Sequence, residues 1–336
     1  MKFLVFIFLF VSSMCSAQDT MLLYLLDKPT NSYLEINNRA QKRRDRNGSV
    51  TNDYDKKVAE QYITQLNTKG SVIQTSRWLN AVKYTTTLTS TEVKAIFPFV
   101  TRTIKNQKRN NFIDKRFDVA GEKVLDYGIA DTQIVQLNLD CLHNADFTGE
   151  TILIAVIDAS FRSMDTIPYF DSVYNDGRIL ETWDFRTNTP AVYTYSGHGT
   201  AVSSTIIAEK SGVDSYAGAA IHSELVLYVS EVAGSETIFE EFNLVMALER
   251  TDSVGADLAN ISLGYLGFDD SLWNHTYADM DGVTTIAAIG VNVASSKGVL
   301  VITSAGNGGP STISTPCDAD SVLCIGAIDR NGVYAF

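Results

Sequence analysis

Apolar residues in the second part of the chain form short continuous runs, and each run ends in a polar or glycine-rich turn. The runs are TILIAVID (151–158), ELVLYVSE (224–231), DLANISLG (257–264), GVLVITSAGN (298–307) and SVLCIGA (321–327). Such runs are typical of strands that are buried on both faces of a parallel sheet. Helix-like stretches lie between them at 199–210, 235–255 and 283–298. The alternation predicts a doubly wound, mostly parallel α/β domain, whose working residues gather beyond the carboxyl ends of the strands.

The first part of the chain, residues 20–110, has shorter strand and helix patterns and predicts a small α/β sandwich. Strands are expected at 21–26, within 71–88 and at 100–104, with Trp78 and Val82 facing inward. Helices are expected at 53–70 and from Thr89, because Thr89 and Glu92 have the spacing of a capping box. The polar, basic stretch Lys105–Asp118 reads as a linker.

The beginning of the chain has the pattern of a secretory signal peptide. Met1 and Lys2 precede the apolar run Phe3–Val11, and the small residues Ser16 and Ala17 follow. We therefore expect a secreted protein. A run of this length cannot cross a bilayer as a helix, and nothing downstream resembles a membrane span. Attachment of a lipid at Cys15 is the minor alternative, because Met14 is bulky for that pattern.

The net charge of −12 is divided unevenly along the chain. Residues 1–120 carry 19 Lys and Arg against 10 Asp and Glu, whereas residues 121–336 carry 8 against 29. The two parts are therefore expected to dock as electrostatic complements, although an acidic domain with a basic linker is the simpler alternative. The patches Lys42–Arg46 and Lys105–Arg109 lack interleaved aromatic residues, so no nucleic acid partner is expected.

Three polar side chains stand where such a sheet collects its working residues. Asp158 ends an apolar run, His198 lies between Gly197 and Gly199 at the start of a helix-like stretch, and Asn307 lies in the turn TSAGNGG. Each has an ordinary structural interpretation: a turn cap, a histidine bonded to a carboxylate, and a turn residue. Their shared position at one edge of the sheet favours a catalytic role.

Four stretches carry a resemblance to a known family. AVIDASF, SGHGTAVSS, NISLGY and SAGNGG, in that order, resemble the subtilisin-like serine proteases over roughly residues 148–336. SRWLNAV and FPFV are similar, less specifically, to the inhibitory propeptides of that family. The resemblance implies a signal peptide (1–17), an inhibitory and chaperone propeptide with its basic linker (18–118), and a subtilisin-like peptidase domain (119–336) that is incomplete at its C-terminus.

The resemblance also implies the site residues and partners. Asp158 would orient His198, His198 would act as the general base, and Asn307 would donate a hydrogen bond to the oxyanion. Protein or peptide substrates and the chain's own propeptide, as an intramolecular inhibitor, are the implied partners. Two backbone triplets are implied to line the substrate groove: Ser262, Leu263 and Gly264, and opposite them Ser304, Ala305 and Gly306.

The sequence departs from the family pattern at the nucleophile. The Gly-Thr-Ser-x-Ala stretch that carries the serine of this family is absent, and 29 residues follow Asn307. The resemblance implies that this serine lies on the order of 60–90 residues beyond Asn307, an estimate that presumes the triad arrangement. We therefore expect a precursor truncated before its catalytic serine and inactive by itself. A pseudoprotease that binds peptides or a partner protein is the alternative.

Cysteine, histidine and acidic residues give no firm further site. Cys317 and Cys324 could close a small disulfide loop, and Cys141 is then expected as a small buried apolar residue. His143, His222 and His275 are scattered, so no metal site is expected. No cofactor is expected either, although family members often bind calcium and the acidic stretch Phe268–Asp270 could serve.

Overall fold

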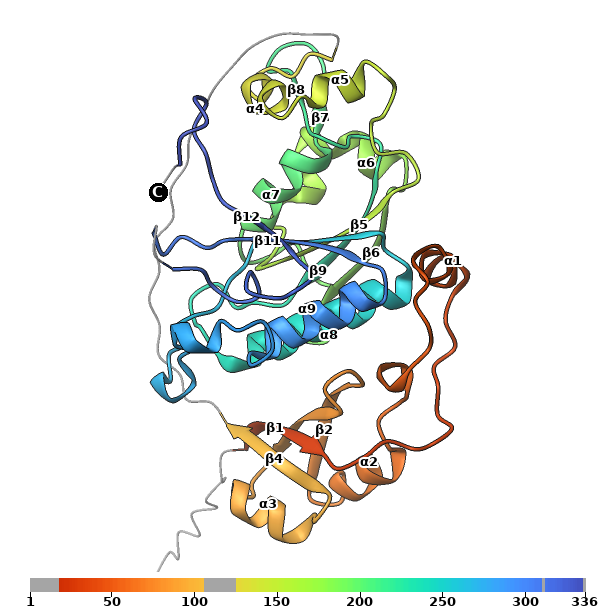
Figure 1. Ribbon diagram of the computed structural model, residues 1–336, viewed down its shortest axis with the longest axis vertical. Helices are drawn as coiled ribbons and strands as arrows, with labels where there is room; N and C mark the ends of the chain where they lie inside the picture. The colour runs from red at the N-terminus through yellow and green to blue at the C-terminus, as the bar shows by residue number, and fades with distance from the viewer. Residues whose placement is uncertain (1–17, 106–124, 310–311, 335–336) are drawn as a thin grey trace, which may run out of the picture.

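Two sheets form the framework of the chain in the computed structural model, which describes residues 18–105, 125–309 and 312–334 (Figure 1). The smaller sheet belongs to an N-terminal domain and the larger one to a C-terminal domain. The predicted signal peptide and most of the predicted linker lie outside the described residues, and the predicted domain boundaries stay predictions. Within the described residues, no helix has the length and apolar character that a membrane crossing requires.

The N-terminal domain is the predicted α/β sandwich. Its four strands are antiparallel in the order β2-β3-β1-β4. The strands are β1 (Asp19–Leu25), β2 (Gly70–Ser76), β3 (Ala81–Thr86) and β4 (Val100–Lys105). The helical segments are α1 (Asn38–Asn47), η1 (Asp53–Asp55), α2 (Glu60–Leu66) and α3 (Ser90–Ile96). At α3 the capping box is confirmed, because Thr89 and Glu92 exchange side-chain to backbone hydrogen bonds.

The expected helix over 53–70 is wrong in its extent. The chain makes one short turn, η1, and then runs extended before α2 begins at Glu60. The reason is a competing backbone partner: Lys57 N donates to Ser32 O at 2.9 Å, and Leu34 N donates to Asp55 O at 3.0 Å. These hydrogen bonds hold the chain in a bridge between Tyr33 and Lys56 that a helix would break.

The C-terminal domain contains a parallel six-stranded sheet in the order β12-β11-β10-β5-β9-β6. Its strands are β5 (Leu153–Asp158), β6 (Ile179–Asp184), β9 (Glu224–Val229), β10 (Leu258–Ile261), β11 (Leu300–Ser304) and β12 (Leu323–Ile325). Five of the six are the predicted runs. Strand β6 is half-buried along most of its length, so the sequence carries no continuous apolar run that would reveal it.

Helices cover both faces of this sheet, as a doubly wound fold requires (Figure 1). The helices of this domain are α4 (Asp131–Gln136), α5 (Leu139–His143), α6 (Asp171–Asn175), α7 (His198–Ile207), α8 (Ile238–Val254) and α9 (Ile286–Ser296), of which α4 and α5 lie beside the hairpin of β7 and β8 and not on the sheet. The shorter segments are η2 (Met164–Thr166), η3 (Pro168–Phe170), η4 (Ser271–Trp273), η5 (Tyr277–Asp279), and the hairpin of β7 (Glu209–Lys210) and β8 (Tyr216–Ala217). Helices α8 and α9 lie between the two sheets.

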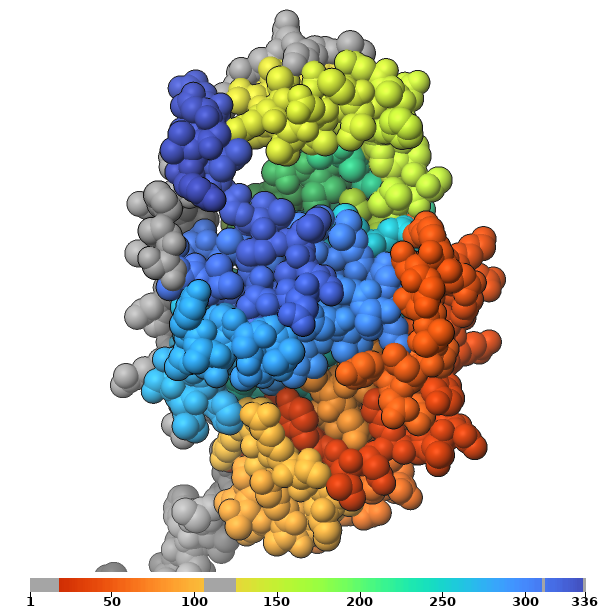
Figure 2. All heavy atoms as spheres, viewed as in Figure 1, coloured from red at the N-terminus to blue at the C-terminus, as the bar shows by residue number. Residues whose placement is uncertain are grey.

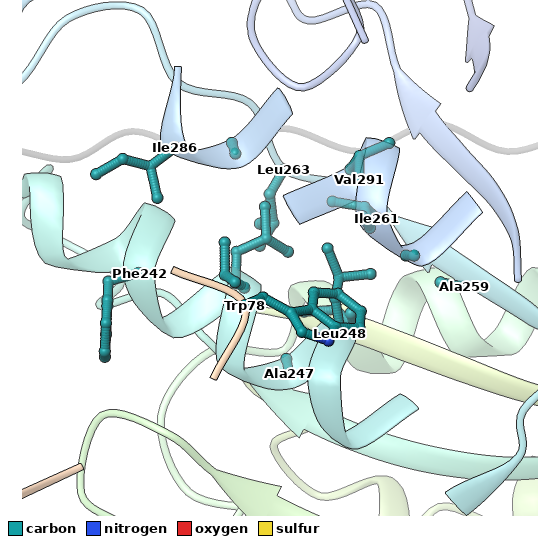
Figure 3. Close-up of a cluster of buried hydrophobic side chains, with 14 of the residues drawn as sticks. Trp78, Phe242, Ala247, Leu248, Ala259, Ile261, Leu263, Ile286 and Val291 are labelled. Atoms are coloured by element: carbon teal, nitrogen blue, oxygen red, sulfur yellow. The ribbon is translucent and has the colours of Figure 1, made fainter. Parts of the chain in front are cut away.

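One apolar cluster joins the two domains. Trp78 of the N-terminal domain packs in the same buried cluster as Leu248 on α8 and Ile261 on β10 (Figure 3). Trp78 is 4% exposed, although it lies in the tight turn between β2 and β3. Val82 instead faces the core of the N-terminal domain itself. The domains therefore share a hydrophobic core as well as charges.

The structure agrees with one of the two expectations for the cysteines and contradicts the other. Cys317 and Cys324 are joined in a disulfide. Cys141 is exposed, so its expected burial is wrong. It lies on the short outer helix α5, which buries His143 instead, where the ring bonds the hydroxyl of Tyr127 at 2.9 Å.

We expect Trp78→Ala to lower the free energy of unfolding of the full chain by about 3–5 kcal/mol, because it empties the centre of the shared cluster. Urea denaturation followed by circular dichroism measures the change. Leu26→Ala is the control, because Leu26 is 63% exposed and its removal should cost less than about 0.5 kcal/mol. Equal effects of the two substitutions would contradict a shared core.

Candidate active site

Parallel pairing brings three predicted segments to one edge of the large sheet. In the register, Ile261 on β10 pairs with Ile157 on β5 and with Thr303 on β11. Each strand therefore ends at the same level, and the residues that follow share the carboxyl edge. Asp158 closes β5, the triplet 262–264 follows β10, and the triplet 304–306 closes and follows β11.

Asp158 and His198 form a hydrogen-bonded pair at this edge. His198 is the first residue of α7, and its Nδ1 lies 2.8 Å from Asp158 Oδ1. Asp158 is fully buried, whereas the side chain of His198 is 52% exposed. An ionised carboxylate can only accept, so Nδ1 carries a proton in this pair and Nε2 of the neutral ring is unprotonated. The imidazole therefore presents a basic nitrogen on its more accessible side.

Two opposing effects act on the carboxyl of Asp158. Burial raises the pKa of Asp158, and the hydrogen bonds from His198 and from the backbone N–H of Ala159 counter that rise. The second carboxyl oxygen, Oδ2, is buried without a hydrogen-bond partner among the described residues. The contact with His198 is thus a large part of what stabilises the charge in this buried position.

Gly199 allows the close contact between α7 and β5. A Cβ at this position would lie 2.6 Å from Ser160 O and 2.9 Å from Asp158 Cβ. The backbone of Gly199 also donates to Ser160 O at 3.0 Å. Any larger residue would push the first turn of α7, which carries His198, away from Asp158. The flanking Gly197 has open space, because a Cβ added there would meet only Arg162 Nη2, at 3.7 Å.

The two predicted groove triplets are held together by a segment that the sequence analysis did not select. Ser314 N donates to Ala305 O at 3.3 Å, and Tyr265 and Thr315 exchange backbone hydrogen bonds of 2.8 and 3.1 Å. Gly306 has a φ of +90°, and a side chain there or at Gly264 would collide with Ser314 Oγ. The sequence has no local signal for the pairing of Tyr265 with Thr315, because these residues are far apart in the chain.

The predicted groove residues differ in accessibility. Leu263 is buried, Ser262, Ser304 and Ala305 are half-buried, and Gly264, Gly306 and Asn307 are exposed. Asn307 lies in the turn that follows β11, at the same edge as Asp158. The same edge therefore carries exposed backbone, the exposed amide of Asn307 and the imidazole of His198.

Glu231 is a further carboxyl at this edge. It follows β9, whose Val229 pairs with Asp158, and Ser230 N donates to Asp158 O at 3.2 Å. Burial, and then the negative charges of Glu236 and Asp158, raise the pKa of Glu231 to about 8. The sequence carries the same signal here as at Asp158, an acid at the end of an apolar run.

Metal ligands are not gathered in the described part of the chain. No three His, Cys, Asp or Glu side chains lie there in an arrangement suited to a metal ion. In the acidic stretch Phe268–Asp270, Asp270 caps η4 by accepting from Leu272 N at 3.1 Å. Calcium binding stays an expectation from the resemblance.

Comparisons with known proteins agree with the two-part organisation. Residues 149–336 match the subtilase family (Peptidase S8), and residues 20–119 match the peptidase S8 propeptide domain of Bacteroidota. Subtilisin BL of Lederbergia lenta is 29% identical over 198 residues, which cover 59% of this chain and 63% of that protein. An alkaline protease of Alkalihalobacillus alcalophilus is 28% identical over 59% of this chain and 45% of its own length.

A solved structure shows the same fold. Fervidolysin from Fervidobacterium pennivorans, a keratinolytic enzyme related to subtilisin, matches 94% of this chain with a TM-score of 0.51 and 16% sequence identity. The chain covers 44% of that structure and about half to two thirds of the two relatives above.

We expect Gly199→Ala to destabilise the chain by about 1–3 kcal/mol and to weaken the contact between His198 and Asp158, because the added methyl overlaps β5. Thermal unfolding and the downfield Nδ1–H proton resonance of His198 measure the two effects. Gly197→Ala is the matched control and should keep that resonance. Retention of the resonance in Gly199→Ala would contradict the steric argument.

We expect Glu231→Gln to stabilise the chain at high pH and not at low pH. Because folding raises the pKa of Glu231 from 4.5 to about 8, the folded state binds this proton more tightly. Stability from this group is complete below pH 4.5 and is lost as the pH rises through 8. The variant should therefore gain about 1–2 kcal/mol over the original chain at about pH 9 and little at about pH 4. Urea titrations at both values test this, and an equal gain at both would contradict it.

Proposed function

The chain belongs to the subtilase family, and on that premise we propose that it is the amino-terminal portion of a secreted serine endopeptidase precursor, with a prosegment (18–118) that inhibits its peptidase domain (119–336). The observation that carries the proposal is the pair of Asp158 and His198 at the carboxyl edge of the sheet. A buried acid, an oriented imidazole and a basic ring nitrogen are the parts that activate a hydroxyl nucleophile.

The proposed mechanism gives each residue one task. Asp158 holds the Nδ1–H tautomer of His198 and stabilises the imidazolium that forms. Nε2 of His198 takes the proton of the attacking serine and returns it to the leaving amine. The Asn307 amide donates to the oxyanion, a contact that contributes roughly 3 kcal/mol in such sites.

Substrate would bind as an extended peptide between the two triplets, 262–264 and 304–306. Exposed backbone beside Gly264 and Gly306 supports this, since backbone pairing grips many sequences and gives broad specificity. Protein and peptide substrates are accordingly proposed.

Docking of the prosegment on the peptidase domain, which intramolecular inhibition requires, is supported by a contact on α8. The carboxylate of Glu249 accepts from Ser76 Oγ at 2.5 Å and from the backbone N–H of Trp78 at 3.0 Å. Burial raises the pKa of Glu249, and the charge of Arg77 together with these hydrogen bonds offsets that rise. The turn between β2 and β3 is thereby fixed on the peptidase domain.

The nucleophile is proposed to lie outside these residues, because they contain no Gly-Thr-Ser-x-Ala stretch. The 336-residue chain alone should then show no peptidase activity above blank. The alternative, a pseudoprotease that binds peptides, would have no chemical need for the oriented pair of Asp158 and His198.

Fluorophosphonate labelling of the natively secreted protein tests the proposal, with intact mass and mapping of the labelled peptide. We expect a labelled serine beyond Phe336 and loss of at least about 1,000-fold in kcat/KM on His198→Ala. His222→Ala is the control. His222 pairs with Glu150 away from the carboxyl edge of the sheet, so this substitution should leave kcat/KM unchanged. A native protein without labelling or turnover would favour the pseudoprotease.

A further inference from the structure

Helix α1 of the prosegment contacts the peptidase domain at the edge opposite the active site. Arg39 bonds Glu224 at the start of β9 at 2.6 Å and Thr151 O, before β5, at 2.9 Å. Arg46 bonds Asp257, before β10, at 2.8 Å. These are the amino ends of the strands. Figure 1 shows α1 at the side of the C-terminal domain, above the prosegment sheet, and Figure 2 shows the red-orange N-terminal segment against the blue part of that domain.

The centre of this contact is a buried cluster of charges, which we call the α1 anchor. It consists of Arg43, Arg44 and Asp55 of the prosegment and Asp252 and Lys297 of the peptidase domain, each with a side chain no more than 3% exposed. Arg44 Nη2 bonds Asp55 at 2.9 Å and Asp252 at 2.6 Å. Lys297 Nζ bonds Asp55 at 2.5 Å, and Arg43 pairs with Asp252.

Both domains contribute both signs of charge to the α1 anchor. Lys297 depends on Asp55 of the prosegment, and Asp252 depends on Arg43 and Arg44, with Arg77 as a weaker third partner at 3.3 Å. Removal of one partner from a buried pair leaves an uncompensated charge, which is strongly unfavourable. The pairs of the anchor are therefore difficult to break one at a time, because each broken pair leaves a buried charge without its partner.

We propose that the α1 anchor keeps the prosegment bound to the peptidase domain after the chain between them is cut. The proposal rests on the inhibitory role proposed for the prosegment. It adds the location of the contacts that keep the prosegment bound. The peptidase partner surface is the acidic one formed by Glu224, Asp252 and Asp257, and its occupant is the arginine-bearing face of α1. A cut between 105 and 125 touches none of these contacts.

The position of each pair sets how retention responds to salt. The side chain of Arg46 is 65% exposed and that of Arg39 34%, so their pairs are screened by added salt. The buried pairs of Arg43 and Arg44 are screened much less. Retention should therefore persist at high salt, with a modest salt dependence that comes from the exposed pairs.

The test uses the full chain with a recognition site for a sequence-specific protease inserted between Asn110 and Asn111 and cut to completion, as confirmed by mass. Gel filtration at about 0.1 and about 0.5 M NaCl, values that bracket the screened range, then shows whether the fragments stay together. Dilution followed by competition with a labelled prosegment gives the dissociation rate. We expect co-elution at both salt concentrations.

Two variants of α1 separate the anchor from a general charge effect. Arg43→Met with Arg44→Met should dissociate at least about 100-fold faster, because Asp252 loses its two closest cations and keeps only Arg77, at 3.3 Å. Arg46→Met removes a charge from the same helix and should change the rate by less than about 3-fold, as for an exposed pair. Equal rates in the two variants, or separation of the original fragments at about 0.1 M NaCl, would overturn the proposal.

Hydrogen exchange on the cut original protein provides a measurement that needs no variant. Amides of α1 should stay protected for as long as the fragments co-elute, and unprotected α1 amides in the complex would also overturn the proposal. Every readout is binding, so the result stands whether or not a labelled serine is found. The 336-residue chain is expected to show no turnover in either case, so a natively secreted protein without a labelled serine would refute the protease and leave the anchor intact.

Discussion

Four buried carboxylates on one helix are the constraint on which the rest of the structure depends. Helix α8 buries Glu240, Glu241, Glu249 and Asp252, and each needs its own partners because unpaired buried charge is prohibitive. Glu240 accepts from the backbone of Val232 and Thr237, and Glu241 from Ala287 N at the start of α9. Glu249 and Asp252 are instead satisfied by the prosegment. The carboxyl edge of the sheet, α9 and the prosegment therefore all supply hydrogen-bond partners to this helix.

The two ends of α8 differ in how well they tolerate acid. Glu240 and Glu241 lie in the first turn, where the helix dipole favours negative charge, although burial raises the pKa of Glu240 to about 9. Glu249 and Asp252 lie near the carboxyl end, where the dipole opposes it. The arginines of the prosegment supply the positive charge that this end lacks. A peptidase domain without its prosegment would therefore carry its least favourable charges at the end of α8 remote from the active edge, which gives the prosegment a physical role in stabilising the fold.

Local sequence patterns predicted the structural features that depend mainly on neighbouring residues. Continuous apolar runs gave five strands of the sheet, and acids or glycines at their ends gave Asp158 and the surroundings of His198. The division of charge predicted docking, but it did not single out α1 or the pairing of Arg44 with Asp252, 208 residues apart. The pairing of Thr315 with Tyr265, which joins the two groove triplets, was missed because these residues are also far apart in the chain. The helix expected over 53–70 failed because backbone pairing with Ser32 and Leu34 outweighed local preference.

The carboxyl edge of the sheet carries the candidate active site, whereas the amino edge contacts the prosegment. Helix α8 runs from one edge to the other. With 17 residues at roughly 1.5 Å each, the helix spans about 25 Å from one edge to the other. Its first turn holds the loop that carries Glu231 beside Asp158, and its last turns hold the prosegment. Because these contacts share one rigid element, loss of the arginines at one end changes the stability of the helix that supports the other. Helix α8 thus links the contacts that hold the prosegment to the carboxyl edge where catalysis is proposed.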